Sequence, residues 1–290
     1  MGNKANTTFG NAWMHRTLIG MLGKADVRLF YAFAYVFVVP VCLVLNASRR
    51  TAYHYFRQRH GYGRLRAMWA TYVNHCMFAQ VVIDRFAMFA GRRFRVVTDG
   101  MEHFNRLAEA PDGFVQLSSH IGCYEVAGYT LVARDKRFNA LVYGAEKATV
   151  MEGREVQLSR NNIRMIPVMP DMSHLFAINE ALAANETVSM PADRVVGSTK
   201  TLTATLLGAE AHFPMGPFSV ATMRGFDVLA VNVMKTSATT YTAHIAPLAY
   251  DKQAPRRQQM QQLVDSYAAQ LDRMLRMYPT QWYNFYEFWS

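Results

Sequence analysis

Hydrophobic and polar positions are patterned differently in the two parts of this chain, and the change falls near residue 90. Before it, apolar residues form long runs of helical length. From about Arg93 onward, short apolar runs alternate with longer amphipathic stretches. Short apolar runs are typical of buried strands, and amphipathic stretches with a period near 3.6 are typical of helices. The pattern predicts a helical amino-terminal part followed by an alternating α/β part.

The order of the elements in the second part indicates a fold class. Strands are expected at residues 94–98, 113–119, 138–143, 165–169, 186–191, 227–235 and 240–246, and helices at 101–110, 124–133, roughly 147–162, 174–185 and 256–278. Such alternation favours an α/β fold with a mixed, largely parallel sheet flanked by helices. We expect this α/β domain over residues 91–290 and a helical unit over residues 1–90.

The longest apolar run lies within the amino-terminal unit. Residues 29–48 carry no charge, and their strictly apolar part, residues 29–45, is 17 residues long. As a helix it would measure about 26 Å, close to the roughly 30 Å of a bilayer core. A signal peptide fits poorly, because the run starts late and Arg49 and Arg50 follow it at once. We expect an anchor that spans or half-inserts into the membrane, and a buried core helix is the alternative.

The chain is also basic, with 31 Lys and Arg against 21 Asp and Glu and a net charge of +10. Six arginines interleaved with aromatic residues follow the apolar run: Arg49, Arg50, Arg57, Arg59, Arg64 and Arg66. Next to an apolar segment, this composition favours interfacial helices on an anionic membrane surface, with the main body on the cytoplasmic side. Nucleic acid is not expected as a partner, because no recognition module can be read from the sequence.

A candidate reactive group lies in the stretch GFVQLSSHIGCYEVAGYTLV, residues 113–132. The pattern predicts a strand ending at Ser119, a turn at His120 and a helix beginning near Tyr124. Ligands in open α/β sheets bind beyond the carboxyl ends of strands, where His120 would lie. Glu125 in the first helical turn is expected to orient the imidazole, whose other nitrogen would remove a proton from a hydroxyl. The alternative is a helix-capping acid beside an incidental histidine.

Cysteine and metal chemistry are not predicted. Cys42, Cys76 and Cys123 are far apart and form no Cys-x-x-Cys pair, which argues against a disulfide framework or a zinc site. A packing role is favoured for Cys123, because nothing beside it is expected to lower the pKa of its thiol.

The residues around His120 resemble the sequence pattern of an enzyme family. SSHIGCYEVAGY resembles the SHxGNWExxG block of the lipid A late acyltransferase family, lysophospholipid-acyltransferase-like enzymes with a His-x4-Asp/Glu signature. VTDGMEHFNRLAEAPDGFVQLSSH is similar to the family's segment leading into that block. MPADRVVGSTKTLTATLLGAEAHFPMGPFSVATMRGFDVLAVNV resembles its "DQ" region, and YPTQWYNFYEFW its closing "P-x-QW" segment.

This resemblance implies a glycerolphosphate-acyltransferase-like fold and an enzyme of the inner membrane. The expected reaction moves a fatty acyl chain from acyl carrier protein or acyl-CoA, as the donor substrate, to a hydroxyl of a lipid or glycolipid acceptor, with no cofactor. His120 would be the general base and Glu125 its partner, and Asp193 matches the family's "DQ" aspartate. An N-acyltransferase for an aminolipid and a non-catalytic lipid-binding protein are the alternatives.

Several positions depart from the family pattern, and they leave the anion-binding residues open. Arg194 replaces the usual Gln and, with Asp193, is expected to bind substrate. Gly144 stands where an arginine is common, so Lys147 is the expected substitute. Arg160 and Arg164, with Arg154, would hold phosphates of the acceptor or carrier, although a solvated basic face is an equal alternative. The departures indicate a divergent member, so lipid A itself is not assigned as the acceptor.

Overall fold

The computed structural model describes residues 12–129, 131, 136–143, 155, 162–169, 171, 173–195 and 200–289. Its helical elements are α1 (Ala12–Leu22), α2 (Val27–Phe33), η1 (Ala34–Val38), α3 (Val39–Leu45), α4 (Ser48–Gln58), α5 (Arg64–Phe89), α6 (Met101–Glu109), η2 (Tyr124–Tyr129), α8 (His174–Ala183), α9 (Met215–Thr222), α10 (Arg256–Met277) and η3 (Pro279–Gln281). Its strands are β1 (Arg95–Asp99), β2 (Phe114–Ser118), β3 (Phe138–Tyr143), β4 (Ile163–Val168), β5 (Thr187–Pro191), β6 (Thr201–Leu206), β7 (Ala209–Pro214), β8 (Asp227–Lys235) and β9 (Thr240–Leu248).

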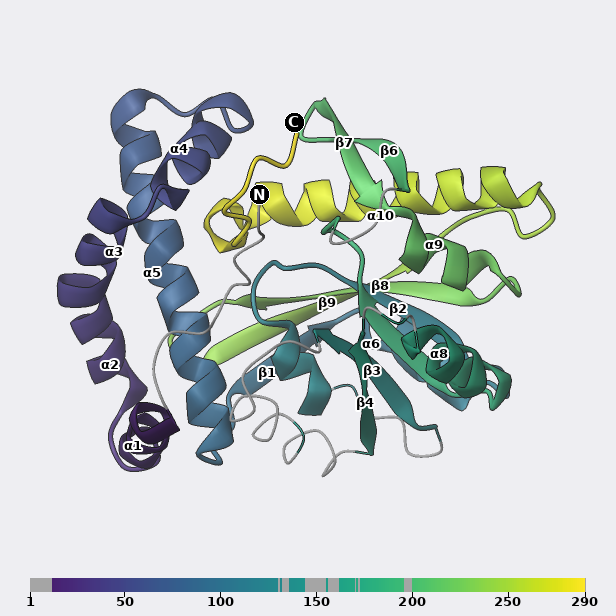
Figure 1. The fold of residues 1–290 in the computed structure, drawn as a ribbon, viewed down its shortest axis with the longest axis horizontal. Helices are drawn as coiled ribbons and strands as arrows, with labels where there is room; N and C mark the ends of the chain where they lie inside the picture. The colour runs from purple at the N-terminus through teal and green to yellow at the C-terminus, as the bar shows by residue number, and fades with distance from the viewer. Residues whose placement is uncertain are drawn as a thin grey trace.

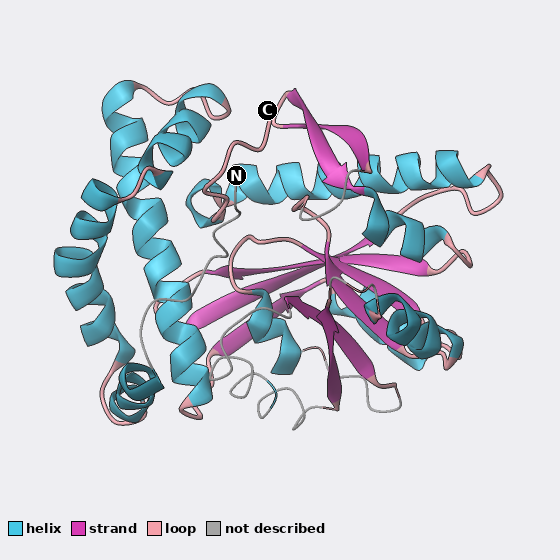
Figure 2. Cartoon of the chain, in the orientation of Figure 1, coloured by secondary structure: helices cyan, strands magenta, loops and turns pink. Residues whose placement is uncertain are grey.

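Seven of these strands form one mixed sheet in the order β1-β9-β8-β2-β5-β3-β4. Figure 2 shows helices on both sides of this sheet. Every neighbouring pair is parallel except β8 with β9, which is antiparallel. The predicted fold class, a mixed and largely parallel sheet flanked by helices, is therefore confirmed.

The sheet separates two hydrophobic clusters, because successive side chains of a strand point to opposite faces. In β8, Val228 and Ala230 belong to the cluster under α8, α9 and α10, whereas Leu229 and Val231 belong to the cluster under α5 and α6. Both clusters also contain residues numbered below 91, such as Phe56. The predicted boundary at residues 90 and 91 stays a prediction.

Some elements differ from the expectation. The segment expected as a helix at 124–133 forms the short 3-10 helix η2, and helix α9 was not predicted. The helix expected at 147–162 lies almost entirely outside the described residues and stays a prediction. A hairpin of β6 and β7 was not predicted. Its two-residue turn, Leu207 and Gly208, has positive φ at both positions, as turns in tight hairpins require.

The amino-terminal helices form a layer beside the sheet (Figure 1). The run α2-η1-α3 packs along α5, and its π-helical turn η1 lies just before Pro40, which cannot donate a backbone hydrogen bond. A buried ion pair ties this layer to the sheet: Asp84 of α5 contacts Lys235 of β8, and both contact the hydroxyls of Tyr31 and Tyr241.

Candidate active site

Strand register brings the two central residues of the site together. In the parallel pair β2 and β5, Ser118 lies opposite Pro191, so the chain positions two residues further on are His120 and Asp193. Both therefore emerge at the carboxyl edge of the sheet, where ligands bind in open α/β folds. The Ala192 backbone N–H donates to the Ser118 carbonyl at 3.0 Å and joins the two ends.

His120 and Asp193 make two hydrogen bonds. The distance from His120 Nδ1 to Asp193 Oδ1 is 2.7 Å, and the His120 backbone N–H donates to Asp193 Oδ2 at 2.9 Å. The Asp193 side chain is 0% exposed, whereas that of His120 is 26% exposed. A buried carboxylate thus fixes an imidazole that remains accessible from solvent.

The pKa of Asp193 is set by opposing effects. Burial by itself would raise it, but the charge of His120, its hydrogen bonds and the guanidinium of Arg194 outweigh burial and lower the pKa. Asp193 is therefore ionised at neutral pH, the form that accepts a hydrogen from Nδ1 and stabilises an imidazolium.

The turn after His120 is held by strand β8. The Cys123 N–H donates to the Val233 carbonyl at 2.8 Å, and Gly122 has φ +56. A Cβ atom added to Gly122 would lie 2.0 Å from the Val233 carbonyl oxygen. Only glycine fits this close approach, which fixes the path of the chain between His120 and η2.

The carboxyl-terminal residues 280–283 hold the same turn from the other side. Gln281 accepts from the Gly122 N–H at 2.9 Å through its backbone carbonyl, and its side-chain amide bonds both backbone groups of Lys235, at 2.8 and 2.7 Å. Asn74 of α5 donates to the carbonyls of Thr280 and Trp282 at 3.0 and 2.8 Å. Sequence reasoning missed both amides as functional residues. The quoted YPTQWYNFYEFW segment was the available signal for Gln281, whereas Asn74 had none.

The same segment reaches the Asp193 loop. Arg194 donates from Nη2 to the Tyr283 carbonyl at 2.9 Å. Arg194 was predicted to bind substrate. The structure places it beside the site, where it influences Asp193 and is anchored to the backbone.

Glu125 differs from the expectation that it orients His120 directly. Its carboxylate forms an ion pair with Arg85 of α5 at 2.9 Å, and it is Asp193 that contacts His120 Nδ1. The physical reason is that η2 is a short 3-10 turn and Asp193 reaches the imidazole from the adjacent strand end. Buried Glu125 still lies within the loop that carries His120, and its catalytic role stays a prediction.

The predicted phosphate-binding residues are not gathered at this site. The registers of the neighbouring strands place Arg164 of β4 level with Val115 of β2, three strands away. Val115 lies five residues before His120. Five residues along a strand are roughly 16 Å, so Arg164 lies toward the amino-terminal ends of the parallel strands, whereas His120 lies at their carboxyl ends. Its partner is Glu180, at 3.8 Å. Lys147 and Arg160, with Arg154, lie outside the described residues.

Thiol and metal chemistry receive no support from the described part of the chain. Burial first, and then the charge of Glu125, raise the pKa of Cys123 to about 12, so its thiol stays protonated. Within the described ranges, no group of three or more His, Cys, Asp or Glu side chains could hold a metal ion.

Comparison with known proteins gives the family. The family described as bacterial lipid A biosynthesis acyltransferase matches residues 67–290. The chain is also similar to the solved 1-acyl-sn-glycerophosphate (LPA) acyltransferase PlsC from Thermotoga maritima, with 14% identity, a TM-score of 0.41, and coverage of 93% of this chain and 99% of that one. No curated protein matches the chain. Because the family match includes His120, Asp193 and the carboxyl-terminal segment, the chain belongs to the bacterial lipid A biosynthesis acyltransferases, which transfer an acyl group from a donor to a lipid acceptor.

Proposed function

We propose that this protein transfers a fatty acyl chain from an acyl thioester to a hydroxyl of a lipid or glycolipid acceptor, with His120 as general base. The donor would be acyl carrier protein or acyl-CoA. The observation that carries this proposal is the accessible imidazole of His120 bonded through Nδ1 to buried, ionised Asp193.

The proposed reaction needs no covalent acyl-enzyme. His120 Nε2 takes the proton of the acceptor hydroxyl as its oxygen attacks the thioester carbonyl. Asp193 stabilises the resulting imidazolium through Nδ1. When the tetrahedral intermediate collapses, the carbon–sulfur bond breaks, and the imidazolium returns its proton to the leaving thiolate. The products are an acyl ester and a free thiol.

The proposed membrane attachment is supported by the amino-terminal layer. Val27–Leu45 is the one helical segment in the described residues with the length and composition to cross a membrane. Its buried side, which includes Val27, Ala34 and Val39, packs within the protein along α5. Its opposite side forms an exposed apolar stripe: Leu29, Phe33, Val36, Phe37, Val41, Val44 and Leu45.

A helix packed along its length against the body of the protein suits insertion of one face better than a span. We therefore infer that the stripe lies in the membrane interface, with the body on the cytoplasmic face of the inner membrane. The headgroup contacts of the arginines stay a prediction. Three of them also make contacts within the protein: Arg49 bonds carbonyls at the end of α3, Arg57 bonds the Tyr62 carbonyl, and Arg66 stacks on the Tyr62 ring.

The catalytic proposal predicts the order of losses in three variants. His120→Ala should reduce acyl transfer by about 100- to 10,000-fold, the range of general-base catalysis. Asp193→Asn should lose at least about 100-fold, because the asparagine can hold the wrong imidazole tautomer. Glu125→Gln should lose less than His120→Ala, because its ion-pair partner is Arg85.

The assay would use purified protein in detergent, with palmitoyl-acyl carrier protein or palmitoyl-CoA and lipid extracts as acceptors. Mass spectrometry of the products, and of lipids from cells with and without the gene, identifies the acceptor and the chain together. An unchanged rate in folded His120→Ala protein would refute the catalytic role and favour a lipid-binding function. A loss in Glu125→Gln equal to that of His120→Ala would restore the predicted direct partnership.

A further inference from the structure

Strand β8 continues past the end of its neighbour β2. Leu117 pairs with Ala230, and β2 ends one residue later at Ser118, whereas β8 continues to Lys235. In a strand, the backbone groups of alternate residues point to the same side, so Val233 and Lys235 present theirs to the same edge. Both residues are buried, and buried backbone groups need hydrogen-bond partners. The partners must come from parts of the chain beyond β2.

The His120 turn and the side chain of Gln281 supply these partners. The Cys123 N–H donates to the Val233 carbonyl at 2.8 Å. Gln281 Oε1 accepts from the Lys235 N–H at 2.8 Å, and its Nε2 donates to the Lys235 carbonyl at 2.7 Å. A primary amide can do both, because it presents an acceptor and a donor side by side. Buried Gln281 thus takes the place of a strand residue and is fixed by β8.

The backbone after Gln281 is bonded to the turn that contains His120. The Gly122 N–H donates to the Gln281 carbonyl at 2.9 Å, and the Tyr283 N–H donates to the His120 carbonyl at 3.4 Å. An antiparallel β-bridge lies between these two bonds. The two segments therefore pair as short antiparallel strands would.

The same segment also holds the loop that contains Asp193. Arg194 donates from Nη2 to the Tyr283 carbonyl at 2.9 Å. The backbone of Tyr283 is therefore bonded to His120 through its N–H and to the neighbour of Asp193 through its carbonyl. The register of β2 and β5 brings His120 and Asp193 together, and Tyr283 joins the two loops that contain them.

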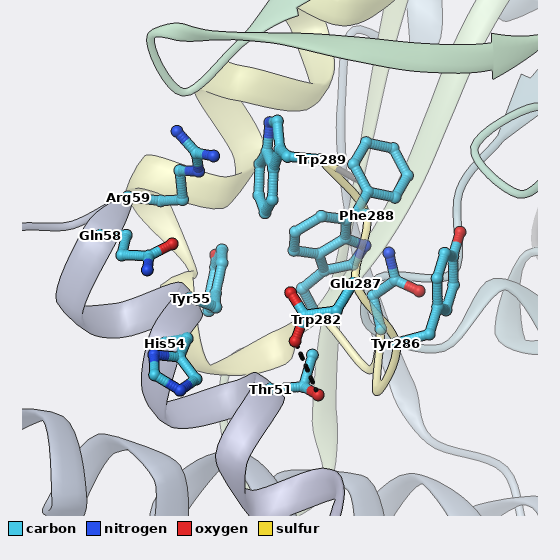
Figure 3. A pocket seen from close by; sticks show the side chains of 11 residues that line it. Thr51, His54, Tyr55, Gln58, Arg59, Trp282, Tyr286, Glu287, Phe288 and Trp289 are labelled. Carbon is cyan, nitrogen blue, oxygen red and sulfur yellow. Dashed lines mark hydrogen bonds between the residues drawn. The ribbon is translucent and has the colours of Figure 1, made fainter.

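The far end of the segment is held by aromatic packing. Figure 3 shows Tyr55 of α4 beside Trp282 and Trp289. Their ring centres lie 5.1 and 6.3 Å from that of Tyr55. Ring pairs are stable over a range of about 4.5–7 Å, whereas hydrogen bonds are directional. The two bonds of the Gln281 amide therefore fix the position of the segment against β8 more closely than the aromatic contacts do.

We propose that Gln281 is a positioning residue for acyl transfer, which holds His120 in place against Asp193 through residues 281–283. The inference rests on the proposed function, because it requires His120 to be the general base. Misplacement of a catalytic group by about 1 Å can reduce a rate by about 100-fold. Gln281 acts through His120, so its loss should lower kcat and leave KM near the wild-type value.

The test measures kcat and KM of Gln281→Met in the acyl-transfer assay, at a temperature at which thermal unfolding shows the variant to be folded. Methionine has a similar length but cannot bond both backbone groups of Lys235, so kcat should fall by about 10- to 100-fold. Asn74→Leu disturbs the same segment from α5, because Asn74 donates to the carbonyls of Thr280 and Trp282. It should lower kcat in the same way, and it decides the question if Gln281→Met does not fold.

Gln259→Met is the matched control. The Gln259 amide also donates to two backbone carbonyls, those of Lys252 and Ala254, at 3.0 and 2.8 Å. These contacts lie at the amino-terminal end of α10, whereas Gln281 follows its carboxyl-terminal end, so kcat should stay within about twofold of wild type. An equal loss of kcat in this control would show that lost amide bonds act through general destabilisation, and it would overturn the proposal.

A double variant separates positioning from structural damage. Gln281→Met in the His120→Ala background should lower the residual rate no further, because the positioned base is already absent. A further loss of about tenfold in the folded double variant would overturn the proposal, as would a wild-type kcat in Gln281→Met and Asn74→Leu. If His120→Ala itself keeps the wild-type rate, the proposed function fails. If His120→Ala alone loses activity, only the role of Gln281 is refuted.

Discussion

Gly122 shows how one residue controls the geometry of the site. Its φ of +56 and the 2.0 Å approach of an added Cβ to the Val233 carbonyl oxygen are separate obstacles to substitution. Gly122→Ala should therefore destabilise the fold by about 2–5 kcal/mol, because it combines left-handed strain with overpacking against backbone. Acyl transfer should fall as well, because the turn that follows His120 would have to move.

Gly208 provides the matched control for this prediction. It also has a positive φ, +77, but a Cβ added there meets no atom within 4 Å. Gly208→Ala should cost only about 1–2 kcal/mol, the conformational part alone, and leave transfer unchanged. Thermal unfolding in detergent and the transfer assay measure both quantities. Similar losses in the two variants would show that the Val233 contact does not matter.

At the scale of elements, the buried pair of Asp84 and Lys235 joins α5 to β8. The side chains are 0% and 1% exposed. Burial raises the pKa of Asp84 and lowers that of Lys235, and each partner's charge opposes the shift of the other. Lys235→Met should cost about 3–5 kcal/mol because it leaves an uncompensated carboxylate, whereas Asp84→Asn/Lys235→Met should recover most of the loss.

The pH dependence of the Lys235→Met variant follows from the pKa of Asp84. Without Lys235, the folded-state pKa of this carboxyl is raised further above its unfolded value. The Asp84 carboxyl in the folded protein then keeps a proton that the unfolded chain releases. The stability from this proton is fully present below the pKa of Asp84 in the unfolded chain, and it is lost as pH rises through the pKa of Asp84 in the folded protein. The defect should be smaller at pH 5 than at pH 8 in thermal unfolding. A pH-independent defect, or no recovery in the double variant, would contradict an electrostatic origin.

At the scale of the whole molecule, the exposed stripe on α2, η1 and α3 should determine membrane binding. Phe37→Glu places a charge in that stripe and should weaken binding to anionic vesicles, measured by flotation, by at least about tenfold, because a buried aromatic side chain contributes about 1.5–3 kcal/mol. Phe176→Glu is the control: Phe176 is 79% exposed, against 60% for Phe37, but lies on α8, away from the amino-terminal layer (Figure 1). Equal flotation of both variants would argue against the stripe as the membrane face.

Deletion of the amino-terminal residues is a less direct test of the same surface. Residues 27–45 include Tyr31, which bonds Asp84 inside the protein, and Ala34 and Val39, which are buried. Removing them would expose part of the core as well as the membrane face. Charge substitutions on the exposed side separate these effects.

The amino-acid sequence by itself determined the elements whose patterns are local. Alternating apolar runs predicted the strands, the uncharged run predicted the apolar helix, and the strand–turn–helix pattern placed His120 at a strand end. The β6–β7 hairpin and the 3-10 character of η2 were missed, because the first depends on positive φ in a two-residue turn and the second on packing against β8.

Only the tertiary structure decided which side chains contact one another across the fold. Asp193, 73 residues from His120, becomes the imidazole's partner because β2 and β5 are neighbours in register. Glu125 of η2 instead pairs with Arg85 of α5, which is 40 residues away in the chain. The amides of Asn74 and Gln281, and the pairing of Asp84 with Lys235, likewise join residues that are distant in the chain. Side-chain periodicity carries information over a few turns or strand residues, whereas such contacts depend on which strands lie side by side in the sheet.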